Sequence, residues 1–128
     1  MIKLIIADDE RIIRETISNL IDWKSLGITL VGLAKDGNEA YNMILDECPD
    51  IVLTDIRMPG LSGLDLIRKT NEVNTNTQFI ILSGYSEFEY AKQAMEYGVR
   101  HYILKPCNEE QIISCIRKVL RTISEQVP

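Results

Sequence analysis

The sequence predicts an α/β protein of the doubly wound kind, in which a parallel sheet lies between two layers of helices. Short unbroken apolar runs recur along the 128 residues, and the segments between them carry apolar residues at helical spacing. Strands without polar alternation are typical of parallel sheets that are buried on both faces. Five strand–helix alternations with right-handed crossovers predict a (βα)5 three-layer sandwich with strand order 2-1-3-4-5.

The first two strands flank an amphipathic helix. Residues 4–7 are entirely apolar and end in the acids of residues 8–10. The helix that follows carries its apolar stripe at Ile12, Ile13, Thr16, Ile17, Leu20 and Ile21. Residues 22–27 close this helix, with Gly27 as its stop, and residues 29–34 form the second strand.

The second helix and the third strand are marked by a cap and a turn. Asp36 and Glu39 have the spacing of a helix N-cap and its partner three residues on. The inner face of this helix, before the proline that ends it, carries Ala40, Met43, Ile44 and Cys48. Residues 51–54 form a buried strand that delivers Asp55 just before the turn of residues 58–60.

A capping box opens the third helix, whose apolar residues are Leu66, Ile67 and Val73. Ser62 and Asp65 form that box. Residues 71–77 are polar and predict a turn. Residues 79–82 then form the fourth strand, which ends at Ser83.

The last two helices have similar starts. Ser86 and Glu89 form a capping box, and the helix runs to Tyr97 with Gly98 as its C′ residue. The fifth strand covers residues 102–104. The final helix is capped by Asn108 with Gln111 three residues later, and its apolar face carries Ile112, Ile113, Ile116, Val119, Leu120 and Ile123.

Composition limits the functional classes. The net charge of −5 argues against nucleic-acid binding by this segment, since a phosphate backbone requires a basic surface. No apolar run reaches the roughly 20 residues of a membrane span, and no signal-peptide pattern is present, so we expect a cytoplasmic protein. The cysteines Cys48, Cys107 and Cys115 form no CxxC pair and are interpreted as reduced core or near-core residues, and His101 as structural.

Five polar side chains are expected at one edge of the sheet. Ligands of open parallel sheets bind beyond the carboxyl ends of the strands, where the strand order reverses. Asp8, Asp9 and Asp55 follow the first and third strands there, and Ser83 and Lys105 follow the fourth and fifth.

Three converging carboxylates favour a bound cation. Two carboxylates about 4 Å apart repel by about 4 kcal/mol at an effective dielectric constant of about 20. Oxygen ligands with room for water suit Mg²⁺, and Mg²⁺ beside an aspartate nucleophile suits phosphoryl transfer. Taken singly, each residue has a plainer interpretation, such as a helix cap, a turn former or a surface lysine. Their joint placement is what favours a site.

These residues, in this order and spacing, resemble the receiver domain of bacterial two-component response regulators, which has the flavodoxin-like fold. The motifs are Asp8-Asp9, the segment 54–59, Ser83-Gly84 and Lys105-Pro106. The resemblance covers essentially the whole chain.

The resemblance implies a role for each residue. Asp55 would be the phosphorylated aspartate, and Mg²⁺ would be held by Asp8, Asp9, Asp55 and the backbone carbonyl of Arg57. Lys105 would pair with the phosphoryl group, Ser83 would be the switch hydroxyl and Tyr102 the switch aromatic. The peptide bond between Lys105 and Pro106 would be cis.

Longer stretches resemble receivers fused to a C-terminal AraC-type helix-turn-helix domain. They are residues 23–28, 34–37 and 83–91. The resemblance implies a receiver over residues 1–124, with 125–128 beginning a linker to an output domain. It also implies a sensor histidine kinase as phosphodonor, phosphorylation-dependent homodimerisation, and DNA binding through the output domain only.

Two other classes stay open from sequence alone. A haloacid-dehalogenase-like phosphatase also forms an aspartyl phosphate, but its nucleophile follows the first strand and has a second Asp two residues later, where this chain has Arg57. A flavodoxin-like cofactor-binding module needs a first loop rich in glycine and hydroxyls, whereas the acids of residues 8–10 would repel a phosphate.

Overall fold

The computed structural model describes residues 1–73, 76–84 and 88–125 and confirms the predicted topology. Five parallel strands form one sheet of order β2-β1-β3-β4-β5. The strands are β1 (Ile2–Ala7), β2 (Ile28–Ala34), β3 (Ile51–Asp55), β4 (Gln78–Ser83) and β5 (His101–Leu104). The α-helices are α1 (Arg11–Leu20), α2 (Gly37–Glu47), α3 (Gly63–Val73), α4 (Phe88–Glu96) and α5 (Glu109–Glu125), and η1 (Trp23–Leu26) is a 3₁₀ helix.

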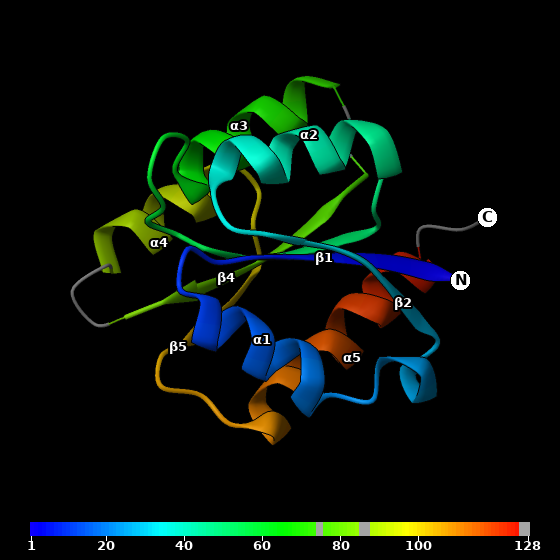
Figure 1. Cartoon of the computed structure of the whole chain (residues 1–128). Helices are drawn as coiled ribbons and strands as arrows, with labels where there is room; N and C mark the ends of the chain where they lie inside the picture. The colour runs from blue at the N-terminus through cyan, green and yellow to red at the C-terminus, as the bar shows by residue number, and fades with distance from the viewer. Residues whose placement is uncertain (74–75, 85–87, 126–128) are drawn as a thin grey trace.

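The sheet separates two hydrophobic cores. Helices α2, α3 and α4 cover one face, and α1 and α5 cover the other (Figure 1). Alternate strand residues point to opposite faces, so Ile5 belongs to the first core and its neighbours Leu4 and Ile6 belong to the second. Because both faces are covered, all five residues of β3 are buried.

Strand register brings the polar strand ends together. Ala7 pairs with Thr54, and Asp55 pairs with Leu82. Ser83 pairs with Leu104, so the residues that follow β1 and β5 lie at the same edge as the ends of β3 and β4. This edge is the one at which the sequence predicts a site.

The apolar stripe predicted for α1 is only partly buried. Ile17 is buried, but Ile12 and Leu20 are 80% and 43% exposed. The helix also ends earlier than predicted, and the buried Trp23 opens the separate η1 turn, which stops at Gly27 with a φ of +75°. The stripe is therefore wider than the core it meets, since α5 shares that face of the sheet with α1.

Two other local predictions were wrong. Residues 71–77 were predicted as a turn, although Val73 was also assigned to the third helix; residues 71–73 form the last residues of α3. Cys48 was predicted to lie in or near the core, but it is exposed at the end of α2, with a φ of +47° and its backbone N–H bonded to Ile44. Helix α2 ends at Glu47, so Cys48 leaves the helical path before its side chain can reach the inner face.

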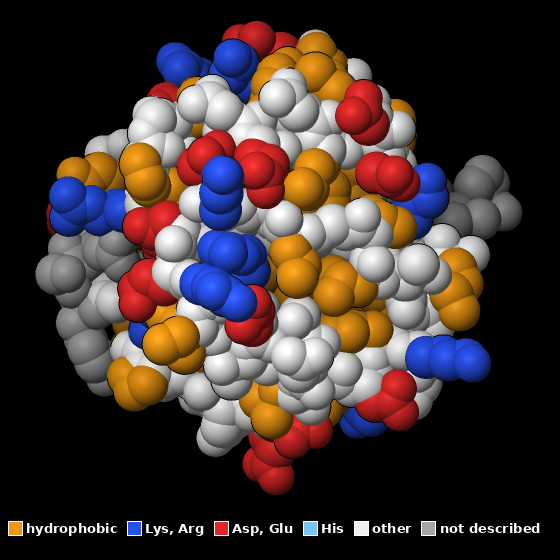
Figure 2. Space-filling view, in the orientation of Figure 1, with side chains coloured by type: hydrophobic (Ala, Val, Ile, Leu, Met, Phe, Trp, Pro, Cys, Tyr) orange, Lys and Arg blue, Asp and Glu red, His pale blue; other side chains and the backbone are white. Residues whose placement is uncertain are grey.

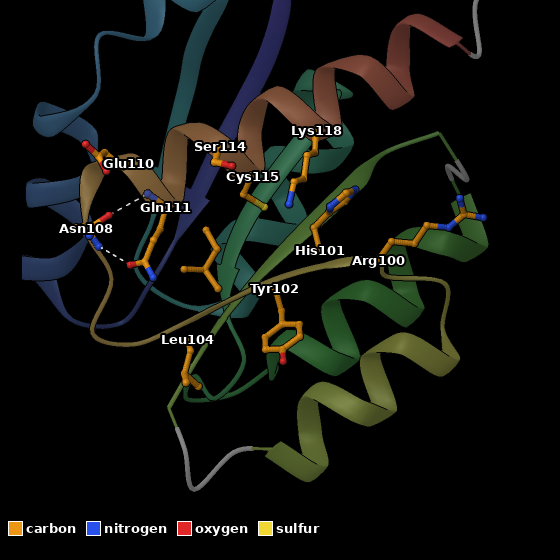
Figure 3. A pocket seen from close by; sticks show the side chains of 11 residues that line it. Arg100, His101, Tyr102, Leu104, Asn108, Glu110, Gln111, Ser114, Cys115 and Lys118 are labelled. Atoms are coloured by element: carbon orange, nitrogen blue, oxygen red, sulfur yellow. Dashed lines mark hydrogen bonds between the residues drawn. The ribbon is translucent and has the colours of Figure 1, made fainter.

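The capping predictions were mostly confirmed. Asp36 accepts a hydrogen bond from the Glu39 backbone N–H, and Ser62 accepts one from that of Asp65. Asn108 and Gln111 bond to each other's backbone N–H groups, as the dashed lines in Figure 3 show. The box predicted at Ser86 includes residues outside the described part of the chain.

Gly37 is expected to tolerate no side chain. A Cβ atom added there would overlap the backbone carbonyl oxygen of Leu61 and come within 2.7 Å of the Leu61 Cβ. Because backbone cannot move aside as a flexible side chain does, Gly37→Ala should lower the free energy of unfolding by about 3 kcal/mol. Urea denaturation measures the loss.

Gly27→Ala is the matched control. Gly27 has a positive φ, but nothing lies within 4 Å of an added Cβ. Its cost should be about 1–2 kcal/mol from backbone strain alone. Equal losses in the two variants would contradict the predicted overlap at Gly37.

Candidate functional site

The three predicted acids meet at the carboxyl edge of the sheet. Asp8 follows β1 and Asp55 ends β3, and both are buried, whereas Asp9 is exposed. One carboxylate oxygen from each lies within 4.8 Å of the others. This geometry brings together the residues that the sequence predicts as metal ligands.

Asp8 is fixed in place but leaves one oxygen without a hydrogen bond. Its Oδ1 accepts a bond of 2.9 Å from the Glu10 backbone N–H, and its backbone carbonyl accepts one of 2.7 Å from Arg14 Nη1. Its Oδ2 is buried and has no hydrogen-bond partner, since Lys105 Nζ lies 3.6 Å away. Burial raises the pKa of Asp8, and it outweighs both the Glu10 bond and the Lys105 charge.

The donor set suits a hard divalent cation. A buried carboxylate oxygen that lacks a hydrogen bond and faces two other carboxylates would gain a counter-charge from a bound cation. All three donors are carboxylate oxygens, which Mg²⁺ prefers in proteins. The edge therefore fits Mg²⁺ by its chemistry. The position of the Arg57 carbonyl relative to the three acids stays a prediction.

Lys105 is paired with Asp55. Its Nζ lies 3.2 Å from Asp55 Oδ1, and the same oxygen accepts a 2.8 Å hydrogen bond from the Ile56 backbone N–H. Burial lowers the pKa of Lys105, but the charges of Asp55 and Asp8 outweigh it, so the pKa is raised. Lys105 is therefore a permanent cation beside Asp55 at neutral pH. The bond between Lys105 and Pro106 is cis, as predicted.

Ser83 and Tyr102 occupy contrasting positions. Ser83 is buried at the end of β4, where its carbonyl accepts a 2.7 Å hydrogen bond from the Lys105 backbone N–H. Tyr102 is 44% exposed and points away from α5, whereas His101 points toward it (Figure 3). Burial lowers the pKa of His101, with help from Lys118 and Arg100, which agrees with a structural histidine. Tyr102 thus has room to change its orientation.

Two features near the site were not predicted from sequence. The Arg57 guanidinium carbon lies 5.5 Å from the centroid of the Tyr90 ring on α4. An apolar groove of about 390 Å³ lies between α1 and the start of α5, and Ile12, Ile13, Thr16, Ile17, Leu20, Leu82, Lys105, Pro106, Cys107 and Ile112 line it. The surplus apolar residues of α1 were a sequence signal for the groove. Nothing in the spacing of Arg57 and Tyr90 signalled their contact.

A family comparison decides which family this chain belongs to. The response regulator receiver domain matches residues 4–117 of the chain. This chain belongs to the response regulator receiver family. The receiver assignment also sets aside the phosphatase and cofactor-module alternatives, and it agrees with the recognition made from sequence. Receivers are signalling domains that take a phosphoryl group from a histidine kinase and are linked to an output domain, and they generally bind Mg²⁺ at an acidic pocket.

The receiver is similar to parts of longer transcriptional regulators. It is 52% identical over 126 residues to the uncharacterized transcriptional regulatory protein YesN of Bacillus subtilis, covering 98% of this chain and 34% of that protein. It is 40% identical to the transcriptional regulatory protein HptR of Staphylococcus aureus, covering 98% of this chain and 49% of that one. The chain thus spans about a third to a half of the length of these relatives.

Solved receivers share its fold closely. The REC domain of AraT, a response regulator from Geobacillus stearothermophilus, has a TM-score of 0.93 at 36% identity and covers 98% of each chain. A two-component transcriptional regulator AraC from Clostridium phytofermentans has a TM-score of 0.92 at 29% identity and covers 100% of each chain. These likenesses agree with the predicted relation to AraC-type regulators. In the described part of the receiver, no helix has both the length and the apolar character needed to cross a bilayer.

Removing the buried charge of Asp8 should stabilise the metal-free receiver. Asp8→Asn keeps the side-chain size and removes one of three clustered carboxylates. Burial of the Asp8 carboxylate raises its pKa, so its charge is unfavourable in the folded state. The free energy of unfolding without Mg²⁺ should rise by about 1 kcal/mol, and the added stability that Mg²⁺ confers should fall. Thermal melts with and without Mg²⁺ measure both effects. Asp9→Asn, at the exposed acid, is the control and should stabilise less; equal gains would contradict the role of burial.

Proposed function

We propose that this receiver stores its signal as an aspartyl phosphate on Asp55 and that Asp8, Asp9, Asp55 and the Arg57 carbonyl hold the Mg²⁺ required to form it. One observation carries the proposal. Asp55 ends a fully buried strand, with Lys105 Nζ 3.2 Å from its Oδ1 and two further carboxylates within 4.8 Å. A nucleophile, a fixed cation and a cation-binding group therefore share one sheet edge.

The chemistry at Asp55 is an in-line displacement. A carboxylate oxygen of Asp55 attacks the phosphorus of a phosphohistidine on the kinase, a new O–P bond forms, and the P–N bond breaks. The bond electrons leave with the imidazole, which then takes up a proton. A bound Mg²⁺ would neutralise charge on the phosphoryl oxygens. Lys105, whose Nζ lies 3.2 Å from Asp55 Oδ1, would supply a second positive charge there, and the Ile56 N–H, which donates to Asp55 Oδ1, orients the nucleophile.

Ser83 and Tyr102 supply the response. The phosphoryl group recruits the Ser83 hydroxyl, which leaves space at the end of β4, and Tyr102 turns from its exposed position into that space. The surface formed by α4, β5 and α5 changes, and this surface serves homodimerisation. The signal is a shift of population between two packings of one fold.

The longer relatives support a wider role for the receiver. A sensor histidine kinase donates the phosphoryl group, and the receiver of residues 1–124 controls an output domain that binds DNA.

The receiver itself does not bind nucleic acid: its net charge is −5, and Figure 2 shows acidic and basic side chains mixed on the face in view. Residues 125–128 begin the linker, although α5 includes Glu125. The protein acts in the cytoplasm, and it is a switch rather than a turnover enzyme.

The test uses a small phosphodonor. The receiver is incubated with acetyl phosphate and Mg²⁺, and its intact mass is measured. We expect the mass to rise by one phosphoryl group, and the rise to disappear when a chelator removes the metal. An unchanged mass with Mg²⁺ present would overturn the proposed function.

A further inference from the structure

The contact between Arg57 and Tyr90 joins the β3–α3 segment, which follows Asp55, to the exposed face of α4. We propose that Arg57 is a phosphoryl-binding residue that rests on the Tyr90 ring before phosphorylation and leaves it for the phosphoryl oxygens afterwards. Phosphorylation would thereby break a tether to α4. This inference rests on the proposed function, since it takes Asp55 as the acceptor.

The resting position of Arg57 is seen in the structure. Its side chain is exposed, and its guanidinium carbon lies 5.5 Å from the centroid of the Tyr90 ring, within cation–π range. Arg57 forms no salt bridge with any residue that the structure describes. Among the described residues, the Tyr90 ring is therefore the one electrostatic partner of this guanidinium, and the contact is weak.

Lys105, the other cation near Asp55, is already paired with carboxylates. Lys105 Nζ lies 3.2 Å from Asp55 Oδ1 and 3.6 Å from Asp8 Oδ2, so it offsets carboxylate charge before any phosphoryl group arrives. Formation of the acyl phosphate replaces the single charge of the Asp55 carboxylate by a dianion. The site then holds more negative charge than Lys105 was offsetting. Arg57 follows Asp55 by two residues and is the nearest arginine along the chain.

The phosphoryl group should bind the Arg57 guanidinium more strongly than the Tyr90 ring does. An exposed cation–π contact is weak, whereas an arginine bound to phosphate oxygens makes charge-assisted and often bidentate hydrogen bonds. Arg57 should therefore leave Tyr90 once the dianion forms. Helix α4 stays in place through its buried residues Ala91 and Ala94, but its exposed side loses the tether to the β3–α3 segment.

Substitutions of Arg57 and of Tyr90 should change binding of the phosphoryl group in opposite directions. Removing the guanidinium takes a ligand from the phosphoryl group, so Arg57→Gln should bind the group less well. Removing the ring frees the guanidinium, so Tyr90→Leu should bind it better. Tyr90→Phe keeps the ring face and should match the wild type. Because Tyr90 acts only through Arg57, Tyr90→Leu should have no effect in the Arg57→Gln background.

The experiment measures the affinity of the intact chain for beryllofluoride, a tetrahedral phosphoryl mimic, in the presence of Mg²⁺. We expect Arg57→Gln to weaken binding by about tenfold and Tyr90→Leu to tighten it by about two- to fivefold. Arg68→Gln removes an exposed arginine of α3 that pairs with Asp65, and Tyr97→Leu removes an exposed tyrosine after α4. Both controls should leave the affinity unchanged.

Each outcome has a clear meaning. Equal affinities of Arg57→Gln and Arg68→Gln would overturn the inference, and so would weaker binding by Tyr90→Leu. An NMR titration adds a direct readout, since the Arg57 side-chain resonances should lose the ring-current shift of Tyr90 when the mimic binds; shifts that persist would also overturn it. If the wild type binds no mimic and gains no phosphoryl mass, the proposed function itself fails, which is a different result from normal binding without an Arg57 effect.

Discussion

Asp55→Asn should abolish phosphoryl transfer to the receiver. Asparagine has nearly the same shape as aspartate, but its amide is a poor nucleophile and carries no charge. With acetyl phosphate and Mg²⁺, the intact mass of Asp55→Asn should stay unchanged under conditions in which the wild type gains one phosphoryl group. The fold should be kept, because the backbone N–H groups and strand pairing around Asp55 do not depend on its charge.

Asp50→Asn is a suitable control. Asp50 precedes the same strand at its opposite end, where its Oδ2 accepts a 2.9 Å hydrogen bond from the Lys3 backbone N–H. This variant should gain the phosphoryl group as the wild type does. Phosphorylation of Asp55→Asn to the wild-type level would mean that another side chain is the acceptor.

Lys105→Gln should give the second largest effect. It removes the cation 3.2 Å from Asp55 and leaves three carboxylates without it. Loss of one fixed charge that stabilises a transition state typically costs about 10²–10³-fold in rate, so phosphorylation by acetyl phosphate should slow by that factor. The rate of mass gain measures the effect, and Lys118→Gln, an exposed lysine on α5, is the control.

The pH dependence of the Lys105 ion pairs follows from its pKa. The nearby acids raise that pKa in the folded state, so the stabilisation is fully present below the ordinary lysine pKa and is lost as the pH rises through the raised value. The stability that separates wild type from Lys105→Gln should therefore be constant across neutral pH. A difference that disappears within the neutral range would contradict the pairing.

The fold could be read from the sequence because each strand contains a short apolar run and the segments between the strands carry helix caps or stops. The site could be read because parallel strands place their carboxyl ends on one edge, which brings Asp8, Asp55 and Lys105 together without any knowledge of side-chain positions. The aspartate pair and the lysine were placed correctly in this way, whereas the cis peptide was implied by the resemblance to receiver domains.

What the sequence could not give depends on packing between elements. Ile12 has the right spacing for a core residue, yet it is 80% exposed, because the pattern of one helix does not tell how much of its face a neighbouring helix leaves to cover. The contact of Arg57 with Tyr90 joins residues 33 positions apart through exposed side chains, which follow no period. Cys48 was predicted on the inner face of α2, but the helix ends one residue earlier, at Glu47.

The division into two cores has a consequence for how the receiver can vary. Helices α1 and α5 pack in one core, and α2, α3 and α4 pack in the other, with the sheet between them. Substitutions on opposite sides share no contacts, so their effects on stability should add. Residues of α1 can therefore be substituted without disturbing the packing of α4. During evolution, sequence changes on the side of α1 and α5 could therefore accumulate while the core beneath α2, α3 and α4 stays the same.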